Sequence, residues 1–168
     1  MLKSLTIIGA GLALGVASPA FACADITSKN VKLTACVDEQ WAAQAAESGP
    51  VEFSYSTADQ NFALQVVTEE TVLNAQQLHD AILANAATAV GKENVKLIGE
   101  RVEAIDGKAF NQLEYTLTDG TTTITYQNLY YSAPGFGAVQ ITALSVPEAA
   151  TSAAFKLGQF AATVKIGG

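Results

Sequence analysis

The sequence predicts an α/β protein of the α+β type, with an antiparallel sheet of about five to six strands and helices packed on it. Segments in which apolar and polar residues alternate follow one another and are separated by short turns. Two of these turns are Asp-Gly pairs, a strong signal for two-residue hairpins because glycine accepts positive φ. Two stretches with apolar residues at helical spacing complete the pattern.

The N-terminal half is expected to contain a hairpin and a short helix. Residues 51–56 and 61–68 alternate on either side of a turn, which predicts two paired strands. Residues 38–47 indicate a short helix, because acidic residues begin the segment and Ser-Gly-Pro ends it. Its Trp41 is expected to anchor packing, and a short strand is expected around residues 31–34.

Two longer helices are also expected. Asn74 can cap the first, Gln77 completes a capping box and Gly91 ends the helix. Pro147 opens the second, which continues to about residue 163. The residues expected to face the sheet are Leu78, Ile82, Ala86 and Val90 on the first helix, and Leu157, Phe160, Ala161 and Val164 on the second.

The remaining strands form a meander whose Asp-Gly turns predict its register. The turn at Asp106-Gly107 would pair Ile98 with Tyr115, and the turn at Asp119-Gly120 would pair Tyr115 with Ile124. The strands are expected at residues 95–105, 108–118, 121–132 and 138–146. The expected core face carries Ile98, Val102, Leu113, Tyr115, Leu117, Ile124, Tyr126 and Tyr130, and the wetter face carries Arg101, Glu103, Gln112, Glu114, Thr125 and Gln127.

Five polar or hydroxyl-bearing residues fall on the expected core face. A carboxylate and two amides cost free energy there unless they have hydrogen-bond partners, and tyrosine hydroxyls can supply some. One hypothesis is a small-ligand cavity between the sheet and a helix. The alternatives are a polar network that satisfies itself, an edge open to solvent, or a bulge at Gly99 that turns the carboxylate outward. The five residues are Glu100, Asn111, Tyr126, Asn128 and Tyr130.

Residues 1–22 are typical of a signal peptide. Lys3 supplies the positive start, an apolar stretch follows, and Ala20-Phe21-Ala22 fits the small-x-small cleavage site. Cleavage after Ala22 predicts an exported, periplasmic protein. A retained anchor, cleavage after Ala24 and lipidation of Cys23 are the alternatives. No later segment is long and apolar enough to span, so no membrane span is expected after cleavage.

Cys23 and Cys36 are the two cysteines of the chain. In an exported protein their default state is a disulfide, which here would tether the N-terminal segment. A redox or metal-binding pair is the alternative, although the spacing is not C-x-x-C and no histidine lies nearby in the sequence.

Composition and motifs argue against several functions. The net charge of −7 becomes −8 when the leader and its lysine are removed, which argues against binding to nucleic acid or to an anionic membrane. The only histidine, His79, lies beside Asp80 and indicates a solvated surface residue, so a nucleophile would lack its base. No metal-binding, nucleotide-binding or hydrolase motif occurs. We therefore expect no enzyme activity, no cofactor and no metal site.

The order of these elements resembles a known family. NFALQVV leads into a helix, and IDGKAFNQLEY, YQNLYY and AVQITAL then precede Pro147 and a terminal helix. This order is similar to the PsbP-like superfamily of α/β/α sandwiches, which includes extrinsic proteins of photosystem II, Ran-binding import factors and exported bacterial proteins. The resemblance covers residues 51–166. It implies a PsbP-like domain over residues 51–168, behind an N-terminal extension with a short helix over residues 23–48.

The resemblance also implies a non-enzymatic binding or assembly role. We expect an exported, soluble protein that binds an unknown protein or small-molecule partner in the cell envelope. For a protein partner, the wetter sheet face or the loop at residues 134–137 is the expected contact. The alternative is a small-molecule-binding or weakly catalytic protein whose cavity is lined by Glu100, Asn111, Asn128 and Tyr130.

Overall fold

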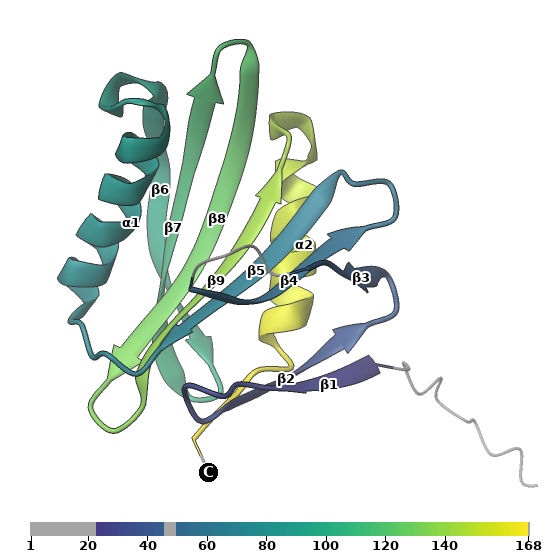
Figure 1. Ribbon diagram of the computed structural model, residues 1–168, viewed down its shortest axis with the longest axis vertical. Helices are drawn as coiled ribbons and strands as arrows, with labels where there is room; N and C mark the ends of the chain where they lie inside the picture. Colours follow the sequence, from purple (N-terminus) through teal and green to yellow (C-terminus); the bar gives the residue numbers. More distant parts are fainter. Residues whose placement is uncertain (1–22, 46–49, 168) are drawn as a thin grey trace, which may run out of the picture.

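The computed structural model describes residues 23–45 and 50–167. The leader expected over residues 1–22 and its cleavage site lie outside these described residues. Helix α1 covers one face of a seven-stranded antiparallel sheet, while helix α2 and a small three-stranded sheet cover the other face (Figure 1). The predicted α+β class is confirmed. Within the described ranges, no helix is both long and apolar enough to cross a membrane.

The large sheet contains one strand more than the upper expectation of six. Its order is β3-β4-β5-β9-β8-β7-β6, and the small sheet has the order β1-β2-β10. The strands are β1 (Cys23–Thr27), β2 (Leu33–Asp38), β3 (Trp41–Ala43), β4 (Val51–Thr57), β5 (Phe62–Glu69), β6 (Val95–Ile105), β7 (Lys108–Asp119), β8 (Thr122–Ala133), β9 (Gly137–Ser145) and β10 (Lys165–Ile166). The helices are α1 (Ala75–Val90) and α2 (Ala150–Ala161), with short 3₁₀ helices η1 (Lys92–Asn94) and η2 (Pro147–Ala149).

Both longer helices form where they were predicted. The Asn74 side chain accepts a hydrogen bond from the Gln77 backbone N–H at 2.9 Å, and the Gln77 side chain accepts one from the Asn74 backbone N–H at 3.0 Å. This reciprocal capping box begins α1, and Gly91, with a φ of 89°, ends it. The buried residues are Leu78, Ile82 and Ala86 on α1, and Ala153, Leu157, Phe160 and Ala161 on α2.

The helix predicted over residues 38–47 is wrong in the part that the structure describes. The Asp38 carboxylate accepts a hydrogen bond from the backbone N–H of Gln40 at 3.0 Å, which turns the chain sharply. Strand β3 follows, with Trp41 paired to Thr57 on β4. Trp41 is buried in the core, as expected of a packing anchor, and its burial overrides the helical propensity of the neighbouring alanines.

The meander forms, but its register differs from the prediction in two places. Asp119 pairs with Thr122, so Tyr115 lies opposite Tyr126 on β8. This shift of two residues leaves every side chain on its predicted face, because side chains alternate along a strand. On β6 the register shifts between Leu97 and Gly99, so Leu97 takes the place opposite Tyr115 that was expected for Ile98.

The expected core face is correct for the inner strands and wrong for the edge. Leu113, Tyr115 and Leu117 on β7 are buried with α1, as predicted. Ile98 is 52% exposed and Val102 is 65% exposed. Both lie on β6, which ends the sheet, and α1 leaves their side chains uncovered.

The face expected to be wetter is covered as well. Gln112, Thr125 and Gln127 are all buried. The Gln127 amide nitrogen donates a hydrogen bond to the carbonyl oxygen of Ala150 at 3.3 Å, so the start of α2 lies over this part of the sheet. These three residues are therefore not available as the protein contact that was expected of them.

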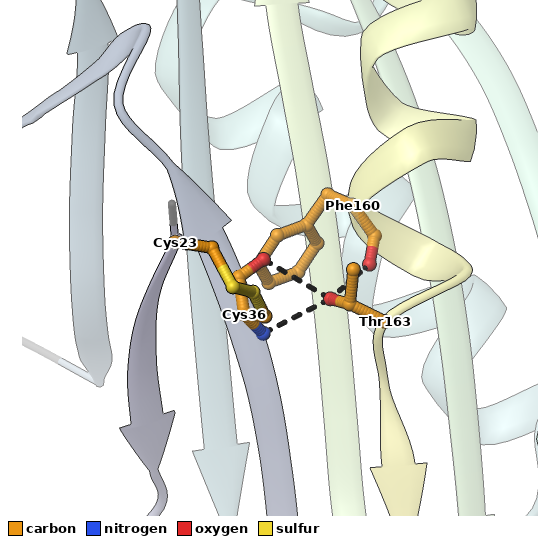
Figure 2. Close-up of a disulfide and its surroundings, with 4 residues drawn as sticks. All are labelled: Cys23, Cys36, Phe160 and Thr163. Atoms are coloured by element: carbon orange, nitrogen blue, oxygen red, sulfur yellow. Dashed lines mark hydrogen bonds between the residues drawn. A yellow bond between two sulfur atoms is a disulfide. The ribbon is translucent and has the colours of Figure 1, made fainter. Parts of the chain in front are cut away.

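The two ends of the described chain meet on β2. The predicted disulfide is confirmed: Cys23 on β1 is bonded to Cys36 on β2, with 5.6 Å between the Cα atoms. On the opposite edge of β2, beyond its pairing with β10, the Thr163 hydroxyl accepts a hydrogen bond from the Cys36 N–H at 3.0 Å. The same hydroxyl lies 3.1 Å from the Cys36 carbonyl oxygen and 2.7 Å from that of Phe160 (Figure 2). The Thr163 side chain thus forms hydrogen bonds to the edge of β2 beyond the point where its pairing with β10 ends.

Gly137 marks a close approach between β9 and the loop that precedes β2. Its φ is 103°, and a Cβ there would meet the Glu69 carbonyl oxygen and the Val31 side chain. We expect Gly137→Ala to lower the free energy of unfolding by about 3 kcal/mol or more, because backbone strain and a clash add. Gly135→Ala is the matched control: its φ is 78° but its Cβ would meet nothing, so about 1–2 kcal/mol is expected. Urea denaturation compares the two, and equal losses would contradict the close approach.

Candidate functional site

The structure brings some of the five predicted site residues together and separates others. Asn111 and Tyr130 lie opposite each other on β7 and β8. Glu100 on β6 pairs with Leu113, which in turn pairs with Asn128 on β8. The fully buried Leu113 side chain therefore lies between the Glu100 carboxylate and the Asn128 amide. Asn128 is wholly buried, whereas the Glu100 side chain is half exposed.

Asn128 is the centre of a polar network on the α1 side of the sheet. Its side-chain oxygen accepts hydrogen bonds from the Gln140 amide and from the Thr142 hydroxyl, the latter at 2.6 Å. Tyr126 stacks on Tyr115 with 5.2 Å between the ring centroids. Burial raises the pKa of Tyr115 to about 12, so its hydroxyl keeps its proton at neutral pH. The oxygen of Asn128 is thus satisfied from within the sheet, whereas its amide nitrogen is buried with no hydrogen-bond partner among the described residues, so the network does not satisfy itself fully.

A cavity of about 250 Å³ lies beside this network, between α1 and strands β5 and β9. None of the five predicted residues lines it, but Gln140, which donates to Asn128, forms part of its wall. The other lining residues include Pro50, Val67, Leu73, Ile82 and Asn85. The predicted small-ligand cavity lined by Glu100, Asn111, Asn128 and Tyr130 stays a hypothesis.

The edge of the sheet carries a charged cluster that the sequence did not predict. His79 on α1 is only 19% exposed at its side chain, and its Nε2 lies 3.3 Å from the Glu100 carboxylate. Its Nδ1 lies 3.0 Å from the carboxylate of Asp80, which also accepts a hydrogen bond from the Gln76 amide at 2.8 Å. The reading of His79 as a solvated residue missed this contact, because Glu100 is on another element. The only sequence signal was that His79 follows the buried Leu78.

The electrostatics of this cluster favour a charged histidine. The hydrogen bond with Asp80 raises the pKa of His79; partial burial opposes the shift, and Glu100 adds to it. Burial, with smaller contributions from Glu100 and Asp80, raises the pKa of the nearby Tyr130. The hydrogen-bond partners of His79 in the described structure are carboxylates and an amide. Chemically, the cluster acts as an ion pair that joins α1 to β6.

An apolar surface borders this cluster on α1 and β6. Leu97, Ile98 and Val102 are 47%, 52% and 65% exposed, respectively. Leu97 also lines a cavity of about 400 Å³ between the two elements. In Figure 1, β6 forms the outer edge of the sheet beside α1. We call Leu97, Ile98, Val102 and this cavity the β6 surface; the cavity is lined by Leu83, Ala84, Ala87, Lys92, Val95 and Leu97.

One group of metal-binding side chains in the described part of the chain is compact enough to hold an ion. It consists of Cys23, Asp25 and Cys36. The two sulfur atoms are bonded to each other in the disulfide, so they are not thiolate ligands.

Comparisons with known proteins identify the fold. No protein-family model and no curated protein sequence matches the chain. Among solved structures, the chain is similar to cyanobacterial PsbP (CyanoP) of Synechocystis sp. PCC 6803, with 10% identity, coverage of 95% of this chain and 99% of that one, and a TM-score of 0.64. It is also similar to the Ran-binding protein Mog1p of Saccharomyces cerevisiae, with 12% identity, 88% and 96% coverage and a TM-score of 0.57.

A third similar structure is LpqN of Mycobacterium tuberculosis, described as involved in cell envelope biogenesis. It has 9% identity, coverage of 86% of this chain and 90% of that one, and a TM-score of 0.50. At these identities the comparisons establish the fold, and they confirm the predicted PsbP-like fold.

The raised pKa of His79 predicts a pH-dependent stability. The folded state binds the proton more tightly than the unfolded chain, whose pKa is near the ordinary value of 6.5. The contribution of His79 to the free energy of unfolding is therefore complete below the unfolded-state pKa and is lost as the pH rises through the raised folded-state pKa. We expect His79→Gln to lower the free energy of unfolding at about pH 5.5 and to have little effect at about pH 9.

Chemical denaturation at the two pH values measures this difference. Glu100→Gln, which removes one carboxylate facing the ring, should reduce the same pH dependence. An equal loss at both pH values would show that the ring contributes by packing and not by charge.

Proposed function

We propose that the protein is an exported, non-enzymatic binding protein of the cell envelope that holds an extended segment of a partner protein on the β6 surface. The observation that carries the proposal is the exposure of Leu97, Ile98 and Val102 along one strand at the edge of the sheet. Exposed apolar groups that lie together are typical of protein-binding surfaces.

The backbone of β6 favours an extended partner. The strand is 11 residues long and pairs with β7 on one side. On its other side, no strand of the described chain satisfies its outward N–H and C=O groups. An extended segment can add to such an edge as a further strand, because main-chain hydrogen bonds supply affinity and side-chain pockets supply selectivity.

The cavity of the β6 surface supplies such a pocket. It opens between α1 and β6, and most of its lining side chains are apolar. An apolar side chain of the partner can enter it beside Leu97, while the Lys92 ammonium group on its wall favours a carboxylate nearby. The partner segment is therefore expected to combine apolar residues with at least one acidic residue.

The same edge carries features that keep such pairing selective. The bulge between Leu97 and Gly99 interrupts the regular edge. Charged side chains follow it, among them Arg101 and Glu103, which form an ion pair at 2.7 Å. Bulges and charges on an edge strand disfavour indiscriminate strand addition and so oppose aggregation.

Two further considerations support an exported binding protein. The disulfide between Cys23 and Cys36 suits an oxidising compartment outside the cytoplasm, and residues 1–22 have the pattern of a signal peptide. Among proteins of the same fold, Mog1p is described as Ran-binding and LpqN as involved in cell envelope biogenesis. Both descriptions are compatible with a binding or assembly role for this chain.

Site-specific photo-crosslinking in cells tests the surface. We expect a crosslinker at Val102 to capture a partner protein, whereas one at Phe155, which is 67% exposed on α2, captures none. Ile98→Asp should reduce the Val102 crosslink by about tenfold or more, because a carboxylate at the interface opposes burial. Since Ile98 is exposed, the melting temperature should change little.

The captured complex then reports how the partner binds. Amide hydrogen exchange should show added protection along β6, as strand addition requires. Crosslinks of equal yield at both positions, or crosslinks only to a second copy of this chain, would contradict the proposal.

Intact-mass analysis of protein recovered from the envelope tests export and maturation. We expect a chain that begins at Cys23 and is lighter by two hydrogens than its reduced form, because both cysteines are oxidised. A chain that begins at Met1, or one that carries both thiols, would contradict the exported form, and a diacylglycerol adduct on Cys23 would show a lipid anchor.

A further inference from the structure

A cavity of about 560 Å³ lies where the C-terminal segment meets the loop between β1 and β2. The loop between β1 and β2, the turn between β8 and β9, and the C-terminal segment come together there, at the lower end of the view in Figure 1. We infer that this cavity binds a small phosphate-bearing molecule, through lysine side chains of which two are carried on a loop that a partly buried hydrogen-bond network holds in place. The site is separate from the β6 surface.

The charge of the cavity is opposite to the charge of the protein. The whole chain has a net charge of −7 and nine basic residues. Three of them, Lys29, Lys32 and Lys165, line this single cavity, and its described lining residues include no Asp or Glu. In an acidic protein, such a concentration of positive charge makes this cavity attractive to anions.

The loop that carries two of these lysines is rigid because it is hydrogen-bonded to the large sheet. The Ser28 hydroxyl oxygen accepts hydrogen bonds from the backbone N–H groups of Asn30 and Val31 at 3.1 and 3.2 Å. It donates to the Glu52 carboxylate on β4 at 2.7 Å. The Asn30 amide donates to the carbonyl oxygen of Thr68 on β5 at 3.1 Å. These bonds position the lysines before any ligand arrives, which lowers the entropic cost of binding.

Two carboxylates, those of Glu52 and Asp106, lie near the lysines. Partial burial acts to raise the pKa of Glu52, but hydrogen bonds from Thr68, the Lys29 backbone and Ser28, together with the charge of Lys29, outweigh it and lower the pKa. The ionised Glu52 is thus held by the loop itself. Asp106 pairs with Lys165 at 3.3 Å. Among the described residues, Lys29 and Lys32 form no ion pair within 4.0 Å.

The remaining wall of the cavity suits an organic phosphate. Thr27 and Thr34 lie opposite each other on β1 and β2, and both are exposed, so their hydroxyls can donate to phosphate oxygens. Val31 and the partly buried Phe136 supply an apolar side. The volume is within the range of about 300–1,000 Å³ that is usual for small-molecule sites.

Nuclear magnetic resonance titration of the disulfide-bonded mature chain with inorganic pyrophosphate tests the site. We expect the amide signals of Thr27, Lys32 and Thr34 to shift in a saturable manner. The double variant Lys29→Gln/Lys32→Gln should raise the Kd by about tenfold or more, because it removes two charge-assisted hydrogen bonds. Only side chains change, so the backbone bonds of the loop and the melting temperature should be preserved.

The double variant Lys96→Gln/Lys156→Gln is the matched control, since it removes the same charge from positions that line neither this cavity nor the β6 surface. Its Kd for pyrophosphate should equal that of the unaltered protein. Equal weakening in the two double variants would overturn the site in favour of a general charge effect. The proposal would also be overturned if pyrophosphate up to about 10 mM produced no saturable shifts and the protein did not bind phosphatidylglycerol vesicles.

A second arm distinguishes a dissolved ligand from a lipid headgroup. Sedimentation with phosphatidylglycerol vesicles, compared with phosphatidylcholine vesicles, measures headgroup binding. If the protein binds phosphatidylglycerol vesicles but not phosphatidylcholine vesicles, and the Lys29/Lys32 change weakens this binding, the phosphate belongs to a lipid. If it binds pyrophosphate but no vesicles, and the same change weakens this binding, the phosphate belongs to a solute. Binding in either arm that the Lys29/Lys32 change does not weaken would overturn the proposal.

Discussion

Strand β2 is the element on which the burial of the second sheet face depends, because the first and last strands of the described chain, β1 and β10, both pair with it. Leu33, Ala35 and Val37 alternate toward the core and are all buried. β1 pairs along one edge of β2, and β10 with the Thr163 hydroxyl occupies the other. The N-terminal hairpin, α2 and the C-terminal strand therefore enclose a single core, and the disulfide secures its outer edge.

This covering determines where the protein can meet other molecules. The central strands of the large sheet are buried on both faces, and the Asn128 oxygen there accepts hydrogen bonds from neighbouring side chains of the sheet. The covering ends in two places. At β6 the sheet ends with apolar side chains exposed, and the outer face of the small sheet exposes Thr27, Thr34 and Lys165. Both proposed binding surfaces lie at these two places, where the outer backbone edge of β6 or the charge of the lysines is available to bind another molecule.

Much of the fold was predictable because it follows from local rules. The capping box at Asn74, the helix after Pro147 and the hairpin at Asp106-Gly107 depend on neighbours within a few residues, and all form as expected. The candidate site was less predictable. The face of Glu100 followed from alternation along β6, and Gly99 indicated a bulge beside it as one of the alternatives, but the contact of Glu100 with His79 depends on the position of α1.

The sequence by itself determined the α+β class, the two helices and most of the strands, because capping and alternation act over short distances. It also determined the disulfide pair, because two cysteines allow only one pairing. Tertiary structure alone decided that Trp41 enters a strand, that Ile98 and Val102 remain exposed, and that the distant Lys165 shares a cavity with the two lysines of the β1–β2 loop. Each of these depends on which elements pack together. That outcome is set by the burial of the whole sheet and is not encoded in any short segment.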